Sequence, residues 1–528
     1  MELLADLRCL YATDEEIIAT GLGADVAGAV VRTAFGHTFA GLVAGGQVRF
    51  AGIPAGTHTV ELYGADDRLI AEELIGVRDD PGQDPIAGFA TSFDAASVPS
   101  TLAWLRRLRC TVVQVYDWME RYSTPLGPMA RYRDPLGREI DRGALAALVA
   151  GIRRAGAVAQ AYAPVAAADR GADAQWRLNR NDGAPESLGD LLDIMDPGSP
   201  AWQRQWIERY GTAADVIGFN GFHLDTYGYP RGAVDADGDA LPLAERYASF
   251  IRAVRAARPH DVISFNQVNG VPAGIEPPDP PGFRYVEVWP PNDRWRHLEA
   301  LMARSAGRRS RPRGDTLAIY PPVWSDDRGG ALRTVVLTEA IATMLGAGTM
   351  MLGDAGGVLR HPYYVDHERL APDELETVLA WHRFGLRCRD LFKQGADTSW
   401  CELDDENAAV TVSAAAPARP EPVAESLFVR VLRSDKTLVV SLLDLTGSRD
   451  GSWSGATAPG TCARAEVTAL VDRPDRWRAQ VAVLGRAGGR FAPLDLREGP
   501  HREGRAVICA VPIATGWSVL RLEKSRKV

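Results

Sequence analysis

The chain has 528 residues, which is too long for one hydrophobic core and predicts two to four domains. It is 46% hydrophobic and 24% charged, a composition typical of a folded soluble protein. Its formal net charge is −9 and it has no long basic run, which argues against nucleic acid as the main partner and leaves a neutral polymer open.

The start of the chain and its apolar runs indicate neither export nor membrane insertion. Met1 to Asp6 contain no basic stretch followed by a long apolar one, so no secretory signal is visible. The longest apolar run, at 340–352, is too short and too rich in glycine to span a bilayer. We therefore expect a soluble, cytoplasmic protein with no membrane partner.

Residues 1–82 predict a small all-β domain. Short segments alternate apolar and polar side chains, and Gly-rich turns separate them at a spacing of about ten residues, which is typical of an immunoglobulin-like β-sandwich. The turn residues Asp79-Asp80-Pro81-Gly82 mark the predicted boundary. The predicted strands are 16–20, 27–33, 38–44, 47–53 and 57–63.

Residues 83–394 change to strands that alternate with long amphipathic helices. Eight such strands predict a central (β/α)8 barrel in a multidomain α/β protein. A doubly wound open sheet is the rival fold, but no Gly-rich phosphate turn follows the first strand. The predicted strands are 86–92, 111–117, 157–164, 221–227, 261–267, 284–289, 316–321 and 349–354. The predicted helices are 99–108, 141–154, 200–212, 243–257, 293–307, 331–345 and 372–392.

Residues 395–528 return to short strands with Gly, Asp and Pro turns. This pattern predicts a second all-β domain, again a β-sandwich. The Ala- and Pro-rich segment 414–422 predicts a mobile loop. The predicted strands are 408–413, 427–432, 437–443, 464–470, 479–484, 506–511 and 517–522.

Carboxylates, amides and aromatic rings gather at the ends of the predicted central strands, which form the reactive rim of a barrel. Such a set suits a sugar, because acids and amides hydrogen-bond its hydroxyls while an indole or phenol stacks on the apolar face of a pyranose. Each of these residues alone also has a structural explanation, such as a turn cap or a ring that covers the rim. The predicted substrate-binding residues are Asp117, Trp118, His223, Asn266, Gln267, Trp289, Tyr320 and Asp354.

Asp225 and Glu287 are the predicted catalytic pair. Glycosidic cleavage needs one ionised carboxyl group that attacks the sugar and one protonated group that assists the leaving oxygen. The two residues lie on the fourth and sixth predicted strands, and alternate strands of a barrel can direct side chains into one pocket. Asp225 beside polar His223 suits the nucleophile, whereas the more apolar sequence neighbours of Glu287 favour a raised pKa and the acid/base role.

The segments around these residues resemble glycoside hydrolase family 66, the dextranases and cycloisomaltooligosaccharide glucanotransferases. Order and spacing agree over residues 85–392, and the flanking β domains agree with the family layout. The resemblance implies a retaining α-glucan-active enzyme with Asp225 as nucleophile, Glu287 as acid/base and Asp117 as a subsite carboxylate. The motifs that carry it are 113–121, 219–228 and 285–289.

The chain also differs from the family near the expected substrate site. Asn220 and Phe222 stand where the family has Asp and Trp, and Thr226-Tyr227 stand where it has Gln-Leu. The connection at 321–330 is short, whereas the cyclising members insert a carbohydrate-binding module there. This short connection disfavours cyclisation.

No metal or cofactor is predicted. The acidic loop 235–239 is similar to a calcium loop, but Ala240 and Arg246 stand where such a loop needs Gly and Glu. Six cysteines show no close pairing, so neither a disulfide framework nor a CxxC metal site is expected. Cys110 lies in an apolar run and is predicted to be a core residue.

Together these features predict a dextranase-like, retaining α-glycoside hydrolase acting by double displacement. Its expected partner is an oligo- or polysaccharide of the α-1,6-glucan or isomaltooligosaccharide type. Two alternatives remain: a transglycosylase that uses the same two carboxyl groups, and a carbohydrate-binding protein whose catalysis has lapsed. Retention of both carboxyl groups argues against the second alternative.

Overall fold

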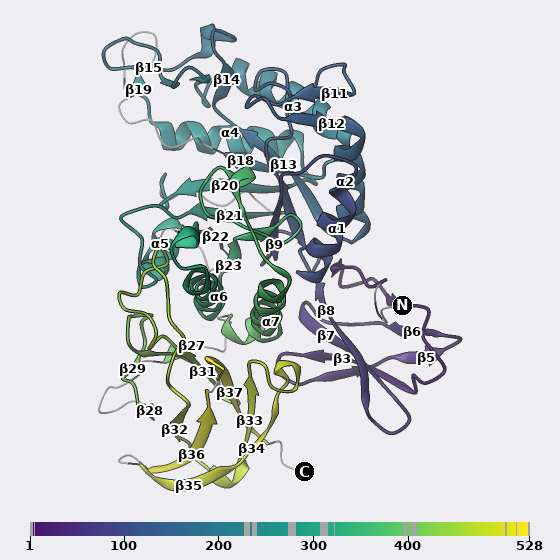
Figure 1. Cartoon of the computed structure of the whole chain (residues 1–528), viewed down its shortest axis with the longest axis vertical. Helices are drawn as coiled ribbons and strands as arrows, with labels where there is room; N and C mark the ends of the chain where they lie inside the picture. The colour runs from purple at the N-terminus through teal and green to yellow at the C-terminus, as the bar shows by residue number, and fades with distance from the viewer. Residues whose placement is uncertain are drawn as a thin grey trace.

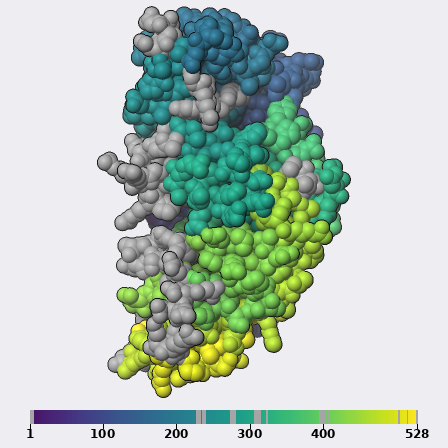
Figure 2. All heavy atoms as spheres, turned by 90° about the vertical axis from the view of Figure 1, so that its left-hand side faces the viewer, coloured from purple at the N-terminus to yellow at the C-terminus, as the bar shows by residue number. Residues whose placement is uncertain are grey.

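The computed structural model arranges the chain in three parts (Figure 1). The N-terminal sheets lie at the right of that view, a curled sheet with its helices fills the centre, and the C-terminal sheets lie at the bottom. In space-filling view the C-terminal part, in green to yellow, packs directly against the central part, in teal and green (Figure 2). None of the helices in the described residues has both the length and the apolar character of a membrane span. The structure describes residues 4, 6–225, 233–234, 240–272, 281–306, 315–321, 323–393, 399–401, 403, 409–501, 504–513 and 515–525.

The N-terminal part consists of two sheets that share one hydrophobic core. Five strands pair in the order β1-β8-β7-β3-β4, and three pair in the order β2-β6-β5. Val31 and Val60 of the larger sheet and Val48 and Phe50 of the smaller sheet belong to the same buried cluster. The strands are β1 (Leu10–Tyr11), β2 (Ile17–Ala19), β3 (Gly28–Thr33), β4 (Thr38–Ala40), β5 (Leu42–Ala44), β6 (Gln47–Phe50), β7 (Gly56–Tyr63) and β8 (Leu69–Val77).

The predicted strand at 38–44 is divided in the structure, because the chain changes sheets at Gly41, between β4 and β5. A Cβ atom at this glycine would lie 2.4 Å from the Phe50 ring, so a larger residue would not fit without a shift. The prediction also omits β1 and β8. In β8 the neighbouring acids Glu72 and Glu73 disturb the apolar alternation, and both form ion pairs with arginines of the last long helix.

The central sheet is an eleven-stranded curled sheet that is compatible with a barrel. Its strands β9, β10, β13, β18, β20, β21, β22 and β23 pair in chain order, and each pair is parallel. Through Gly353, β24 also pairs with β9 in parallel, so the segment that contains β23 and β24 joins both edges of the row. The strands are β9 (Ala87–Ala90), β10 (Val112–Val115), β13 (Val158–Pro164), β18 (Gly221–Asp225), β20 (Val262–Val268), β21 (Gly282–Glu287), β22 (Thr316–Ala318), β23 (Gly348–Met350) and β24 (Leu352–Gly353), followed by the antiparallel β25 (Gly357–Val358) and β26 (Glu368–Arg369).

Long helices connect most of these strands and cover the sheet (Figure 1). They agree with the predicted helices to within a few residues, except that α3 continues to Ile217. The connection between β20 and β21 lies mostly outside the described residues. The helices are α1 (Val98–Arg107), α2 (Arg142–Arg154), α3 (Pro200–Ile217), α4 (Leu243–Ala257), α5 (His297–Ala306), α6 (Arg328–Met344) and α7 (Pro372–Cys388).

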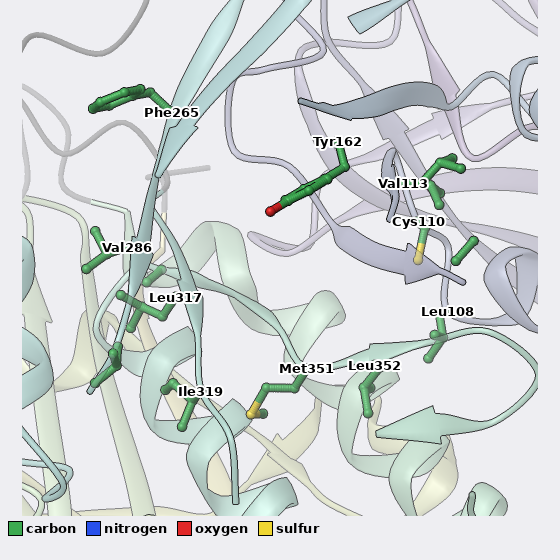
Figure 3. Close-up of a cluster of buried hydrophobic side chains, with 14 of the residues drawn as sticks. Leu108, Cys110, Val113, Tyr162, Phe265, Val286, Leu317, Ile319, Met351 and Leu352 are labelled. Carbon is green, nitrogen blue, oxygen red and sulfur yellow. The ribbon is translucent and has the colours of Figure 1, made fainter. Parts of the chain in front are cut away.

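Alternate residues of the central strands face opposite sides of the sheet. Phe222, Val286 and Leu317 belong to the large cluster that also contains the helix side chains, whereas Phe283 and Ala318 belong to a separate cluster on the enclosed side. Both faces are therefore buried, which explains the nearly continuous apolar strands. Figure 3 shows Val286 and Leu317 with neighbouring side chains of the large cluster.

Two groups of short strands, which the sequence did not predict, form small separate sheets in the connections that follow β10 and β13. A hairpin of β11 (Arg131–Arg133) and β12 (Glu139–Asp141) follows β10. A longer excursion follows β13 and lies at the top of Figure 1. It contains β14 (Ala167–Asp169), β15 (Asn179–Arg180), β16 (Ser187–Leu188) and β17 (Leu192–Ile194), and β15 pairs with β19 (Ala233–Val234).

The C-terminal part again has two sheets around one hydrophobic cluster. It docks on the central helices, where the Trp517 ring lies 4.8 Å from that of Phe384. The segment 414–422 is not wholly a loop, because β29 pairs in parallel with β30, and this corrects the prediction. The strands are β27 (Ser399–Cys401), β28 (Val410–Ala414), β29 (Ala418–Arg419), β30 (Leu427–Arg433), β31 (Thr437–Asp444), β32 (Arg464–Leu470), β33 (Trp477–Val483), β34 (Ala492–Leu494), β35 (Leu496–His501), β36 (Gly504–Pro512) and β37 (Trp517–Lys524).

Candidate active site

Three adjacent strands bring two acids and one amide together at the carboxyl end of the central sheet. Asp225 ends β18, Glu287 ends β21, and Asn266 lies on β20 between them. The Asn266 amide nitrogen donates to Asp225 Oδ1 over 2.9 Å and to Glu287 Oε2 over 3.0 Å. An amide nitrogen carries two hydrogens, so each acid receives one of them and the orientation of the amide is defined.

Each acid also receives a hydrogen bond from a phenol. The Tyr162 hydroxyl donates to Asp225 Oδ2 over 2.6 Å, and the Tyr320 hydroxyl donates to Glu287 Oε1 over 2.7 Å. Tyr162 comes from β13, the neighbour of β18, and Tyr320 follows β22, the neighbour of β21. Both oxygens of both carboxyl groups are therefore held by neutral donors.

The protonation of Glu287 is shifted by its surroundings. Burial raises the pKa of this carboxyl, and the charge of Asp225 raises it further. Hydrogen bonds from Asn266, Tyr320 and Trp289 oppose the shift without reversing it. A carboxyl group that keeps its proton above the usual pH range is suited to donate that proton to a leaving oxygen.

His223 is a buried, neutral side chain two residues before Asp225 on β18. Its Nδ1 lies 2.9 Å from Ser264 Oγ, and the Ser264 hydroxyl donates to Gln160 Oε1 over 3.2 Å. The Gln160 amide nitrogen donates to two backbone carbonyls, so its Oε1 is the acceptor and His223 Nδ1 is the donor to Ser264. Burial lowers the pKa of His223 to about 4, although the charge of Asp225 opposes this.

Asp117 lies at the exit of β10 as a buried acid. Its backbone has φ 48°, and its carbonyl accepts a hydrogen bond from Arg138. Burial raises the pKa of Asp117 to about 7, Arg138 opposes the shift, and the charges of Asp134 and Asp225 add to it. This carboxyl is therefore coupled electrostatically to Asp225.

Trp289 and Tyr320 form the aromatic edge next to Glu287. The Trp289 side chain is 39% exposed, and its ring meets the Tyr320 ring edge to face at 6.3 Å. The backbone N–H of Trp289 donates to Asn269 Oδ1, which fixes the start of this turn. An exposed indole beside a reactive carboxyl is suited to stack on a sugar ring.

Trp118 and Gln267 differ from the prediction that they contact substrate. Trp118 is fully buried in the large cluster, and its indole N–H donates to the Tyr162 carbonyl over 3.0 Å. Gln267 follows Asn266 on the same strand and so points to the other face, where its amide donates to the Pro272 carbonyl. Because both side chains are buried and hydrogen-bonded to the backbone, neither offers a surface on which a sugar can bind.

Asp354 is likewise occupied by the fold. It is buried, and Thr91 donates to its carboxylate through both the backbone N–H and the hydroxyl, over 3.1 and 2.5 Å. The backbone N–H of Asp354 donates to the Phe89 carbonyl. The structure therefore places this predicted substrate-binding acid at the junction of β24 and β9, where Thr91 occupies its carboxylate.

A group of tyrosines beside the acid pair was missed by the sequence analysis. The Tyr116 ring lies 4.6 Å from that of Tyr162 and stacks at 4.5 Å on Tyr364, whose hydroxyl also bonds that of Tyr285. In Figure 3 the Tyr162 ring projects away from its strand, with the hydroxyl pointing toward the side of Phe265 and Val286. Tyr162 pairs in register with His223, and only this register, which the sequence alone does not give, brings Tyr162 to Asp225.

No group of three His, Cys, Asp or Glu side chains among the described residues is arranged to hold a metal ion. The acidic loop 235–239 and the segment Thr226-Tyr227 after the predicted nucleophile lie outside those residues. Five cysteines of the described chain, including Cys110, are buried free thiols.

Comparisons with known proteins place this geometry in context. The family model for glycosyl hydrolase family 66 matches residues 60–520. Two cycloisomaltooligosaccharide glucanotransferases of Niallia circulans are 27% identical over 203 residues and 25% identical over 213 residues. These matches cover 33% and 35% of this chain but only 21% and 22% of those proteins, so the chain aligns with about a fifth of the curated relatives.

Solved structures share the fold. The crystal structure of a Paenibacillus sp. cycloisomaltooligosaccharide glucanotransferase complexed with cycloisomaltoheptaose has a TM-score of 0.81 at 16% identity and covers 99% of each chain. An α-amylase from Geobacillus thermoleovorans, complexed with acarbose, has a TM-score of 0.53 at 10% identity and covers 84% of this chain and 99% of that chain. Because the family model spans most of the sequence, the resemblance is confirmed, and the chain belongs to glycosyl hydrolase family 66.

Proposed function

We propose that this protein is a dextranase-like, retaining α-glycoside hydrolase that cleaves α-1,6-glucans or isomaltooligosaccharides. The observation that carries the proposal is the shared amide of Asn266. Since its nitrogen lies 2.9 Å from Asp225 Oδ1 and 3.0 Å from Glu287 Oε2, these two oxygens are within about 6 Å of each other. Retaining enzymes hold their carboxyl groups about 5–5.5 Å apart, whereas inverting enzymes hold them about 6.5–9.5 Å apart.

In the first step, an Asp225 oxygen attacks the anomeric carbon while Glu287 transfers its proton to the glycosidic oxygen. The glycosidic bond breaks, the leaving sugar departs as an alcohol, and a covalent glycosyl ester of Asp225 forms. In the second step, the ionised Glu287 takes a proton from water, whose oxygen attacks the same carbon and releases Asp225. The raised pKa of Glu287 supports its assignment as the acid in the first step.

The remaining rim residues receive supporting roles in this proposal. Trp289 stacks on a sugar ring next to Glu287, Asp117 binds sugar hydroxyls, and His223 and Asn266 maintain the arrangement of the acid pair. The partner is an oligo- or polysaccharide. We also propose that residues 83–394 form a (β/α)8 barrel and that 1–82 and 395–528 form β-sandwich domains. The parallel strand order and the paired sheets support this division.

Transglycosylation is the second candidate, in which a sugar hydroxyl replaces water in the second step. It is favoured by the names of the two curated relatives and of the solved structure with the TM-score of 0.81, all of which are glucanotransferases. The same two carboxyl groups would serve both reactions, so the acceptor decides between them. A carbohydrate-binding protein without turnover is the remaining alternative.

Digestion of dextran and isomaltoheptaose in ¹⁸O-labelled water distinguishes these candidates, with products read by mass spectrometry. Hydrolysis introduces one ¹⁸O at each new reducing end, whereas transglycosylation yields longer or cyclic products without the label. We expect labelled, shorter products at low substrate concentration. Absence of any product with wild type, or equal turnover by an Asp225→Asn variant, would contradict the proposed function.

A further inference from the structure

Five neighbouring strands present a symmetric series of side chains around the acid pair. In sheet order, β13 carries Tyr162, β18 carries Asp225, β20 carries Asn266, β21 carries Glu287, and Tyr320 follows β22. The series is therefore phenol, acid, amide, acid and phenol. The central amide is shared by both acids, whereas the Tyr162 phenol donates to Asp225 and the Tyr320 phenol donates to Glu287.

Each phenol donates to a different acid, so the two phenols can affect Asp225 and Glu287 differently, whereas the Asn266 amide donates to both. A hydrogen bond donated to a carboxylate stabilises its ionised form. Asp225 has to be ionised in order to attack, so the Tyr162 hydroxyl favours the state that the first step needs. Glu287 starts protonated and has to be ionised in the second step, and the Tyr320 hydroxyl favours that later state.

Burial and the Asp225 charge both favour protonated Glu287, so without an opposing influence this residue would give up its proton with difficulty. Tyr320 supplies part of that opposition at 2.7 Å. A group that works first as an acid and then as a base needs a balance between its two states near the working pH. The geometry thus gives the two phenols different tasks.

We propose that Tyr162 and Tyr320 are positioning residues with separate effects: the Tyr162 hydroxyl stabilises the attacking carboxylate of Asp225 and aims it, and the Tyr320 hydroxyl stabilises the Glu287 carboxylate that activates water. This inference rests on the proposed function. Other groups also act on the pair, and both phenylalanine variants keep these side chains. The titratable groups coupled to one or both acids are Tyr116, Asp117, His223, Tyr285 and Tyr364.

The test compares kcat/KM across pH for wild type, Tyr162→Phe and Tyr320→Phe, because this ratio reports the ionisation of the free enzyme. We expect Tyr162→Phe to move the acidic limb to higher pH by about one unit, and Tyr320→Phe to move the alkaline limb to higher pH by about one unit. In each variant the other limb moves much less. Tyr63→Phe removes a phenol from the N-terminal sheet and serves as the matched control, with both limbs in place.

The inference would be overturned if both variants shifted the same limb of the pH profile, or if neither limb shifted in an active variant. Either result would leave the proposed function intact. Absence of turnover in wild type would instead overturn the proposed function. Carboxyl ¹³C NMR then still tests the structural part, with the Glu287 resonance assigned by Glu287→Gln. The Glu287 titration midpoint is expected to be higher in Tyr320→Phe than in wild type, and an unchanged midpoint would contradict the inference.

Discussion

Acidic side chains at the two ends of the central sheet have different kinds of partner. At the amino end, Asp315 precedes β22 and lies 2.7 Å from Arg284, and Asp84 precedes β9 and is surrounded by cations. At the carboxyl end, Asp225 and Glu287 accept hydrogen bonds from a shared amide and two phenols, and Glu287 also from Trp289. Balanced charge at one end favours stability, whereas two acids held by neutral donors at the other favour proton transfer.

The pKa shifts of Asp84 and Glu287 follow this difference, whereas at Asp315 burial outweighs the single Arg284 charge and raises the pKa to about 6. Burial opposes ionisation of Asp84, but Arg389, Lys393 and Arg78 together hold its pKa well below the usual range. Burial acts on Glu287 in the same direction, and here the neighbouring charge is that of Asp225, so its pKa is raised. Desolvation therefore yields an ionised structural acid at Asp84 and a protonated reactive acid at Glu287, depending on the sign of the neighbouring charge.

The largest expected effect comes from removing either reactive acid. Asp225→Asn and Glu287→Gln should each lower turnover of isomaltooligosaccharides by at least about 10³-fold, because each removes an essential carboxyl group. The free energy of unfolding should be equal or higher, since each change relieves repulsion between two half-buried acids. Steady-state kinetics measures the loss of turnover, and urea denaturation measures the stability.

Azide rescue then assigns the two roles. A small residue at position 225 should allow azide to attack directly and yield a product of inverted anomeric configuration. Product inversion after the same change at position 287 would reverse the assigned roles. Wild-type turnover by both amide variants would remove Asp225 and Glu287 from the mechanism altogether.

At the amino end of the sheet, removing an acid should lower stability and leave turnover unchanged. Asp84→Asn leaves Arg78, Arg389 and Lys393 without their shared acid, and we expect a loss of about 3–5 kcal/mol in the free energy of unfolding at neutral pH. Since the folded-state pKa of Asp84 is depressed, its contribution is present above about pH 4 and is lost as the pH falls. Urea unfolding at pH 7 and pH 3 measures the difference, while kcat of the folded fraction should stay near that of wild type. If Asp84→Asn kept its stability and lost turnover, the contrast between structural acids at the amino end and reactive acids at the carboxyl end would be wrong.

Asp117 provides an intermediate case, since it is a buried acid near the reactive end. Its pKa of about 7 lies above the ordinary value, so the folded state binds the proton more tightly than the unfolded state. Stability should therefore fall by roughly 2–4 kcal/mol as the pH rises from about 4 to 8. In Asp117→Asn this part of the pH dependence should disappear in urea unfolding curves, and parallel curves for both proteins would contradict the shift.

Much of the strand and helix pattern could be predicted from the sequence, because continuous apolar runs mark strands buried on both faces and apolar periodicity marks elements buried on one face. The predicted helix at 243–257 coincides with α4, and the predicted strand at 464–470 coincides with β32. The short strands after β13 were missed, since two- and three-residue strands carry too few side chains to show a period.

The candidate site was only partly predictable for a different reason. Residue type and strand end indicated Asp225, Asn266 and Glu287, which the structure brings together. Burial and partners depend on three-dimensional packing, so the sequence did not reveal that Trp118 is enclosed in the core. Tyr162 was missed because its role depends on the register between β13 and β18.

The smallest expected effect concerns the exposed aromatic edge. Trp289→Ala should raise KM for isomaltooligosaccharides by roughly 10-fold with little change in stability, because the exposed indole offers a stacking surface. Trp118→Phe is the matched control, which should lower the melting temperature and leave KM unchanged, since this indole is buried. The reverse pattern would exchange the roles of the two indoles.

The anomeric configuration of the first product tests the central claim most directly. Proton NMR should be recorded within the first minutes of isomaltooligosaccharide cleavage, before mutarotation equilibrates the new reducing end. Two carboxyl groups within about 6 Å predict that the α anomer appears first, by retention through a glycosyl ester of Asp225. Initial formation of the β anomer would show single displacement and contradict the account.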